Sequence, residues 1–281
     1  MTTESATHAA AFLRDKDRER YFASLVLPAA IQPAVRALYA FNADVASVRE
    51  RVSEPAPGEI RLQWWTDALK GAGHGDVRQN PLADALLDAI KQFDLPTVPL
   101  LRLITARRFD LYHDPMPDVP TFEGYAGETV SVLYQLTAMM LNNGQMVETG
   151  DAAGHLGVAQ ALIGHLRAFG YNAAGGRLFL PLSIFTANGV GENEIFAGTL
   201  SEGLVSARRQ LIDLARDHLQ KASAAIAALP RPLRPAFAPI ALLAGQLRRI
   251  EANAEHAFAA SPDLADWQKL AMLVWWNWRN R

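Results

Sequence analysis

Apolar residues recur at the spacing of a helix along most of the chain. One helical face collects Leu82, Leu86, Leu87, Ile90 and Phe93. The segment 130–141 is apolar on almost every side, which is typical of a buried helix. A third stripe extends over residues 204–219, with Arg208 and Arg209 expected on its solvent side. Because no run of alternating β-branched residues occurs, the pattern predicts helices and no strands.

Gly- and Pro-rich segments interrupt these helical patterns. The clearest are residues 53–59, 71–81, 113–120, 172–176 and 229–235. They divide the chain into about nine or ten predicted helices. None of them is long or biased enough to separate two domains. The sequence therefore predicts one all-α domain over residues 14–281, preceded by a flexible N-terminus over residues 1–13.

The amino-acid composition restricts the classes of function with which the sequence is compatible. Half of the 281 residues are hydrophobic and 20% are charged, as in a globular protein. The net charge of −2 gives no basic field for nucleic acid, so we expect no nucleic-acid partner. The absence of Cys excludes disulfides and thiolate metal ligands. No stretch approaches the roughly 18–20 apolar residues that span a bilayer, and no signal peptide is evident. We expect a cytoplasmic protein, or a peripheral one at the inner face of the cytoplasmic membrane.

Two stretches carry a family resemblance. They read LYAFNADVASVRERV over residues 38–52 and LGVAQALIGHLRAFGYNAAGGRLFLP over residues 156–181. Together they resemble the squalene/phytoene synthase superfamily of all-α prenyltransferases, and the resemblance covers about residues 14–281. It implies a helical bundle of the isoprenoid-synthase type around a central cavity. Enzymes of this family join two prenyl diphosphates, and paired aspartates hold the Mg²⁺ that neutralises the departing diphosphate.

The same resemblance implies that most of these aspartates are missing here. The family's six acidic positions fall on Ala46, Ser47, Glu50, Ala168, Tyr171 and Asn172. Only Glu50 is a carboxylate, so the metal positions Ala46, Glu50, Ala168 and Asn172 are degenerate. One carboxylate cannot hold several divalent cations, because each missing charge pair weakens the site. We therefore expect no metal and no cofactor.

Within the family, one branch is more similar. The strings FNADVASVRERVSE, IRLQWW and LRAFGYN resemble the mitochondrial assembly factor for respiratory complex I that has this fold. This resemblance implies a non-catalytic assembly or lipid-handling factor, with a respiratory complex subunit as partner. The alternatives are a pure interaction module with a filled cavity, and an active head-to-head prenyltransferase that uses Mg²⁺. The prenyltransferase gains support if Asp44, Asp110, Asp114 or Glu128 turns toward Glu50.

The resemblance also gives candidate site residues. The ligand-binding candidates are Tyr39, Asn42, Ala46, Glu50, Tyr125, Arg167, Ala168, Asn172 and Arg177. Tyr125 and Glu50 are the catalytic candidates of the prenyltransferase alternative. Without the aspartates, arginines (Arg167 and Arg177, with Arg36 or Arg49) are expected to bind the anionic head of an isoprenoid or another lipid. Tyr39 and Tyr125 fit a core role as well. His155 and His165 lack a third ligand at metal spacing, so a structural or exposed role is expected.

The C-terminal segment is rich in tryptophan. One helical stripe contains Trp267, Leu270, Ala271, Val274, Trp275 and Trp278. Two interpretations remain open: a last core helix, or a surface that contacts a membrane or partner through Trp267, Trp275, Trp276 and Trp278. Because Trp276 lies off the stripe, we expect it to be exposed.

Overall fold

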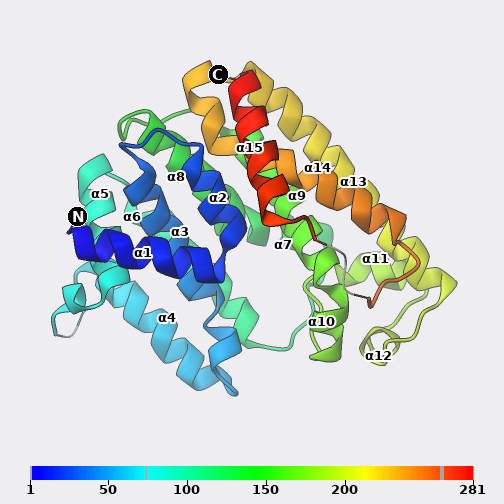
Figure 1. Cartoon of the computed structure of the whole chain (residues 1–281). Helices are drawn as coiled ribbons and strands as arrows, with labels where there is room; N and C mark the ends of the chain where they lie inside the picture. Colours follow the sequence, from blue (N-terminus) through cyan, green and yellow to red (C-terminus); the bar gives the residue numbers. More distant parts are fainter. Residues whose placement is uncertain (1, 74, 260–262, 281) are drawn as a thin grey trace.

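The computed structural model describes residues 2–73, 75–259 and 263–280, and within these ranges the chain is a bundle of α-helices without strands (Figure 1). The α-helices are α1 (Thr3–Lys16), α2 (Arg18–Leu25), α3 (Gln32–Ala46), α4 (Pro55–Lys70), α5 (Pro81–Phe93), α6 (Thr97–Arg107), α7 (Val119–Ala126), α8 (Val132–Leu141), α9 (Gly150–Arg167), α10 (Phe169–Ala174), α11 (Leu182–Ala187), α12 (Glu192–Phe196), α13 (Glu202–Ala228), α14 (Ile240–Ala252) and α15 (Asp266–Asn280). The 3₁₀ segments are η1 (Arg49–Arg51), η2 (Val77–Gln79), η3 (Arg108–Leu111) and η5 (Arg231–Phe237), and η4 (Gly127–Ser131) is a π-helix turn. The all-α prediction is confirmed.

The helices are more numerous than the sequence pattern suggested. Fifteen α-helices occur in the described ranges, against about nine or ten expected. The extra ones are short pieces such as α10, α11 and α12, which have five or six residues each. Segments of that length are too short to show a helical period in the sequence.

The N-terminus is an ordered helix that packs into the bundle. Thr2 caps α1 by accepting a hydrogen bond from the backbone N–H of Ser5. Ala9 and Leu13, one helical turn apart, are fully buried, and α1 lies against α3 and α5. A flexible segment was expected over residues 1–13, whereas residues 3–13 belong to this helix. The sequence pattern did not reveal this packing, because the helix is rich in alanine and its buried face is narrow.

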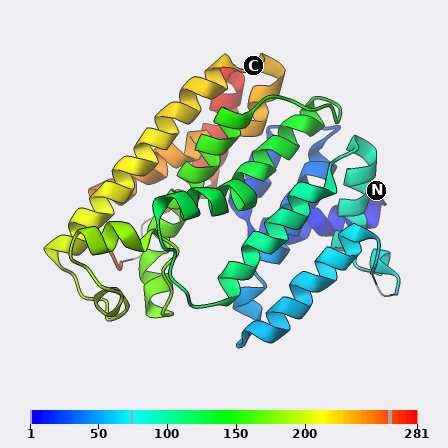
Figure 2. The ribbon, with the colours of Figure 1, turned by 180° about the vertical axis from the view of Figure 1, so that it is seen from behind.

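Two large hydrophobic clusters form most of the core, and the helices of each stay together in space (Figures 1 and 2). The first cluster joins α1, α3, α4, α5 and α6 with one side of α8. The second joins α7, α9, α13 and α14. In both views α9 lies between α13 and the N-terminal half, beside α8. Within the described residues, no helix is both long and apolar enough to cross a bilayer.

The longest helix, α13, confirms one predicted stripe and corrects one of its residues. Leu204, Leu211 and Leu219 are buried as expected. Arg208, expected on the solvent side, is only 2% exposed and donates hydrogen bonds to the carbonyl oxygens of Asn253 and Ala254. The reason is its position four residues after Leu204 and three before Leu211, which places it on the buried face.

A close approach joins α9 to the π-helix turn η4. A Cβ atom on Gly157 of α9 would lie 2.1 Å from Ser131 Oγ and 2.6 Å from the backbone nitrogen of Ser131. Only a glycine permits this spacing, since real Cβ contacts are never so short. The π-helix turn and α9 both contribute to the cavity described below, so this contact sets the position of two of its walls.

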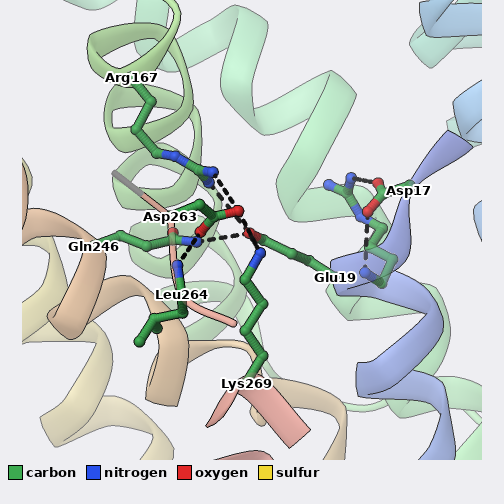
Figure 3. A network of polar contacts seen from close by, with 8 residues as sticks. Asp17, Glu19, Arg167, Gln246, Asp263, Leu264 and Lys269 are labelled. Carbon is green, nitrogen blue, oxygen red and sulfur yellow. Dashed lines mark hydrogen bonds and ion pairs between the residues drawn. The ribbon is translucent and has the colours of Figure 1, made fainter. Parts of the chain in front are cut away.

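The last helix, α15, is fixed to the bundle by a polar network (Figure 3). The Lys269 side chain is 5% exposed, and its Nζ lies 3.0 Å from Glu19 Oε1 and 2.5 Å from Asp263 Oδ2. Arg167 and Gln246 donate to the same oxygen of Glu19, at 3.2 and 2.8 Å. The network therefore ties α2, α9, α14 and α15 together.

This attachment decides which face of α15 meets solvent. Trp267, Trp275 and Trp278 are 71%, 61% and 69% exposed. Trp276 instead packs, partly buried, against the small core cluster that includes Leu273. The expectation of an exposed Trp276 is therefore wrong, and the apolar stripe is not a core face. Lys269 and the residues near Trp276 share the inward face because they lie seven residues, two helical turns, apart.

We predict that Gly157→Ala destabilises the protein by about 1–3 kcal/mol, because the added methyl group collides with the backbone of Ser131. Gly154→Ala, on the same helix, is the matched control. No atom lies within 4 Å of its Cβ position, and the change should stabilise α9 by up to about 1 kcal/mol. Urea unfolding of both variants measures the difference. Equal stabilities would contradict the close approach.

Candidate functional site

A cavity of about 360 Å³ opens between the two halves of the bundle. Its walls come from α2, α3, η1, α6, η3, α7, η4, α9 and α10, and from the turn after α10. Five of the predicted site residues line it: Ala46, Glu50, Tyr125, Ala168 and Asn172. Residues that are far apart in the sequence thus meet at the positions where the family resemblance places the metal-binding aspartates.

Four predicted site residues do not line the cavity. Tyr39 is a core residue whose hydroxyl lies 3.1 Å from Thr137 Oγ1. Asn42 is 2% exposed and also belongs to the interior. Arg167 forms ion pairs with Glu19 and Asp263 in the network of Figure 3. Arg177 is half-buried in the turn after α10 and is absent from the cavity wall. Arg167 and Arg177 were expected to face the cavity, but neither lines it, and Arg167 instead pairs with Glu19 and Asp263.

Two carboxylates, Glu50 and Asp110, line the cavity. The Asp110 side chain is 8% exposed and accepts hydrogen bonds from Tyr125 Oη at 2.7 Å and Arg107 Nη1 at 2.9 Å. Glu50 is exposed at the rim. Among the described residues, no group of three or more His, Asp or Glu side chains could hold a metal ion. Of the four acids whose placement separates the alternatives, only Asp110 turns inward.

The other acids are engaged or distant. Asp44 accepts from Trp65 Nε1 at 2.8 Å and pairs with Arg51 at 2.6 Å, outside the cavity. Neither Asp114 nor Glu128 is part of its wall. The residues present therefore do not fit the paired-carboxylate cage that Mg²⁺ needs, since one inward acid is already neutralised by Arg107.

Arginines dominate the charge of the wall. Arg20, Arg49 and Arg107 all line the cavity. Arg20 pairs with Asp17 at 2.5 Å, and Arg107 pairs with Asp110. The guanidinium of Arg49 lies over the ring of Phe179, 5.0 Å from its centroid, as in a cation–π contact.

Sequence reasoning found Arg49 as one of two options but missed Arg20 and Arg107. Arg20 lies outside both stretches that carry the family resemblance. Nothing in the sequence indicated that Arg107 lines the cavity, because this residue ends a helix far from both motifs. The other option, Arg36, bonds instead to Ser24 and Gln32.

Burial shifts the pKa values of two ionisable groups in the cavity wall. It raises the pKa of Tyr125 well above its usual range, although nearby Arg107 opposes the shift. Burial, assisted by the positive charge of Arg107, lowers the pKa of His165 to about 3. The His165 ring stacks on Phe179, 5.0 Å between centroids. At neutral pH, Tyr125 is therefore a hydrogen-bond donor and His165 is uncharged. His165 was expected to be structural or exposed, and its place in the cavity wall was missed.

The π-helix turn η4 follows Tyr125 directly. Thr129 and Val130 of this turn line the cavity, and Thr129 Oγ1 donates to the Tyr125 carbonyl oxygen at 2.7 Å. Such turns are rare and occur frequently at functional sites. Here the irregular turn brings side chains of both α7 and η4 into one wall.

Fold and cavity together define a protein class. The sequence profile of the squalene/phytoene synthase family matches residues 13–271, so the chain belongs to this family. Solved structures agree in fold. A dehydrosqualene synthase in complex with a ligand superimposes with a TM-score of 0.79 at 18% identity, covering 99% of this chain and 98% of the other. Squalene synthase HpnC from Alicyclobacillus acidocaldarius gives 0.75 at 18% identity, covering 89% and 94%.

Among curated relatives, assembly factors align well. NADH dehydrogenase (ubiquinone) complex I, assembly factor 6, of Rattus norvegicus is 30% identical over 248 residues, which span 88% of this chain and 74% of the relative. Its Homo sapiens counterpart is 29% identical over 239 residues, spanning 85% and 72%. The 15-cis-phytoene synthase of Synechocystis is 27% identical over 251 residues, spanning 85% and 74%. The predicted resemblance to both the family and its assembly-factor branch is confirmed.

Proposed function

We propose that this protein is a non-catalytic assembly or lipid-handling factor of the respiratory complex I type. The observation that carries the proposal is the carboxylate inventory of the cavity. Where the family resemblance places four metal contacts, the wall presents Ala46, Ala168, Asn172 and the exposed Glu50. The similarity to complex I assembly factors supports the same conclusion.

The physical argument concerns the charge of the leaving group. A departing diphosphate carries several negative charges, which Mg²⁺ ions normally neutralise. Holding those ions takes several carboxylates, and the only inward one, Asp110, is bonded by Arg107 and Tyr125. Releasing Asp110 for a metal would leave Arg107, whose side chain is only 15% exposed, without its partner, which is costly.

A head-to-head prenyltransferase is the second candidate, and one observation favours it. Asp110 does turn into the cavity that Glu50 also lines. In that case Mg²⁺ would bind at Glu50 and Asn172, and Tyr125 would stabilise positive charge on the substrate. The hydrogen bond that Arg107 Nη1 donates to Tyr125 Oη at 2.8 Å argues against this role, because a positively charged donor occupies a lone pair of the hydroxyl oxygen.

The exposed stripe of α15 is proposed as the contact surface for the inner face of the cytoplasmic membrane. Its three indoles are at least 61% exposed, and Val274 between them is 53% exposed. Tryptophan is favoured at the boundary between water and lipid, because it joins a large apolar ring to an N–H donor. The buried Lys269 on the opposite face keeps the stripe turned outward. A membrane-bound location would bring the protein close to a respiratory complex subunit.

We predict that the protein releases no diphosphate from farnesyl diphosphate, with or without Mg²⁺. The reason is that the cavity lacks the carboxylates that would hold the metal. The measurement is a coupled diphosphate assay, with an active family member run in parallel as the positive control. Mg²⁺-dependent release of diphosphate would refute the non-catalytic proposal and favour the prenyltransferase.

We further predict that the double variant Trp275→Ser/Trp278→Ser weakens binding to anionic phospholipid vesicles by about ten-fold or more, since two indoles no longer enter the interface. Vesicle co-sedimentation measures the change. Ile60→Ser is the control, because Ile60 on α4 is equally exposed at 72% but lies outside the stripe. If both variants bind like the wild type, the stripe is not the membrane surface.

A further inference from the structure

One cationic group of the cavity has no acidic partner. In the part of the chain that the structure describes, no carboxylate lies within ion-pair distance of Arg49, whereas Arg20 and Arg107 each have one. The Nε of Arg49 is buried and makes no hydrogen bond. Glu50, the next residue, is exposed at the rim, where water screens its charge. The interior of the cavity therefore holds one positive charge that is not neutralised.

Two neutral amides add donors around this charge. The Gln160 side chain accepts a hydrogen bond from Tyr134 at its Oε1, and nothing in the described chain bonds to its Nε2. The side-chain amide of Asn172 is likewise unbonded within the described residues, although Asn172 is only 9% exposed. Arg49, Gln160 and Asn172 come from η1, α9 and α10, so donors enter the cavity from three elements.

This arrangement fits a tetrahedral oxyanion. A planar carboxylate is satisfied by one arginine fork, whereas phosphate has more oxygens and accepts hydrogen bonds from several directions. The volume of about 360 Å³ suits a head group with a short apolar portion rather than a whole lipid. Ala46, Val130 and Ala168 supply the apolar part of the wall.

We propose that the cavity binds a phosphate monoester or diester directly on Arg49, with Gln160 and Asn172 as neutral donors and without a divalent metal. The inference rests on the proposed non-catalytic function and names the ligand class of that same cavity. Arg49 then does with its own charge what metal ions do in an enzyme that cleaves a diphosphate. Binding leaves the ester intact, because no step requires bond cleavage.

The test is calorimetric titration of the full chain in EDTA with two probes, inorganic phosphate and dihexanoyl phosphatidic acid. Saturable binding of either probe without metal is the expected result. Tighter binding of the phosphatidic acid identifies a lipid phosphate as the ligand, and equal affinity identifies a free phosphate. If neither probe binds in EDTA, the inference is overturned.

Variants assign the binding to Arg49. Arg49→Gln should weaken it by about ten-fold or more, as expected when a charged hydrogen bond is lost, and Arg49→Lys should restore part of it. Arg102→Gln, an exposed arginine on α6, is the charge-matched control and should change affinity less than about two-fold. Unchanged affinity in folded Arg49→Gln would overturn the assignment.

A second variant keeps the test decisive if Arg49→Gln does not fold. Ala46→Asp places a carboxylate in the same wall, so it should repel phosphate and weaken binding to a similar degree. Equal binding in Ala46→Asp and the wild type would contradict a site at Arg49. Different results would refute the two proposals. Mg²⁺-dependent diphosphate release refutes the non-catalytic function. If neither probe binds in EDTA and no diphosphate is released, only the phosphate site is refuted.

Discussion

A single carboxylate oxygen, Oε1 of Glu19, holds together the parts of this protein that its function needs. It receives bonds from Lys269, Arg167 and Gln246, which come from α15, α9 and α14 (Figure 3). The neighbouring residue, Arg20, lines the cavity. The same contact therefore positions one cavity wall and turns the tryptophan stripe of α15 toward solvent. With its positive partners bound, Glu19 costs less to bury than an isolated charge would.

The second constraint is electrostatic. A helical fold shared with a squalene synthase and a dehydrosqualene synthase encloses a cavity whose walls carry three arginines and two carboxylates. Arg107 and Tyr125 both donate hydrogen bonds to Asp110, and burial keeps Tyr125 protonated. The polar groups in this part of the cavity therefore satisfy one another. The role that we propose for this cavity is therefore the binding of an anion rather than of a divalent cation. The family fold is thus compatible with a binding role that needs no chemistry.

Much of the fold was predictable from the sequence, because long helices repeat their buried positions many times. The stripes on α5 and α13 and the single all-α domain follow from that repetition. The packing of α1 was missed because its buried face is narrow and consists of only Ser5, Ala9 and Leu13. On α15 the period was right, but it left open whether the apolar stripe faces the core or solvent. A sequence period cannot reveal that Lys269 on the opposite face pairs with Glu19, 250 residues away.

The candidate site was predictable only where a motif marked it. The motif positions Ala46, Glu50, Ala168 and Asn172 do converge on one cavity. Arg107 and Asp110 were not predicted as a pair, because their contact with Tyr125 depends on how α6 meets α7. Arg167 was assigned to the cavity from its place in a motif, yet it pairs with Glu19, which lies 148 residues away in the sequence.

The most direct test of the central claim asks whether the cavity binds divalent metal at all. Free Mn²⁺, a carboxylate-seeking substitute for Mg²⁺, is measured by electron paramagnetic resonance while the protein is added in the presence of a non-cleavable farnesyl thiolodiphosphate. We predict that the signal of free Mn²⁺ stays at the level seen with the diphosphate alone. A saturable loss of that signal on adding protein would show a metal site in the cavity and contradict the account.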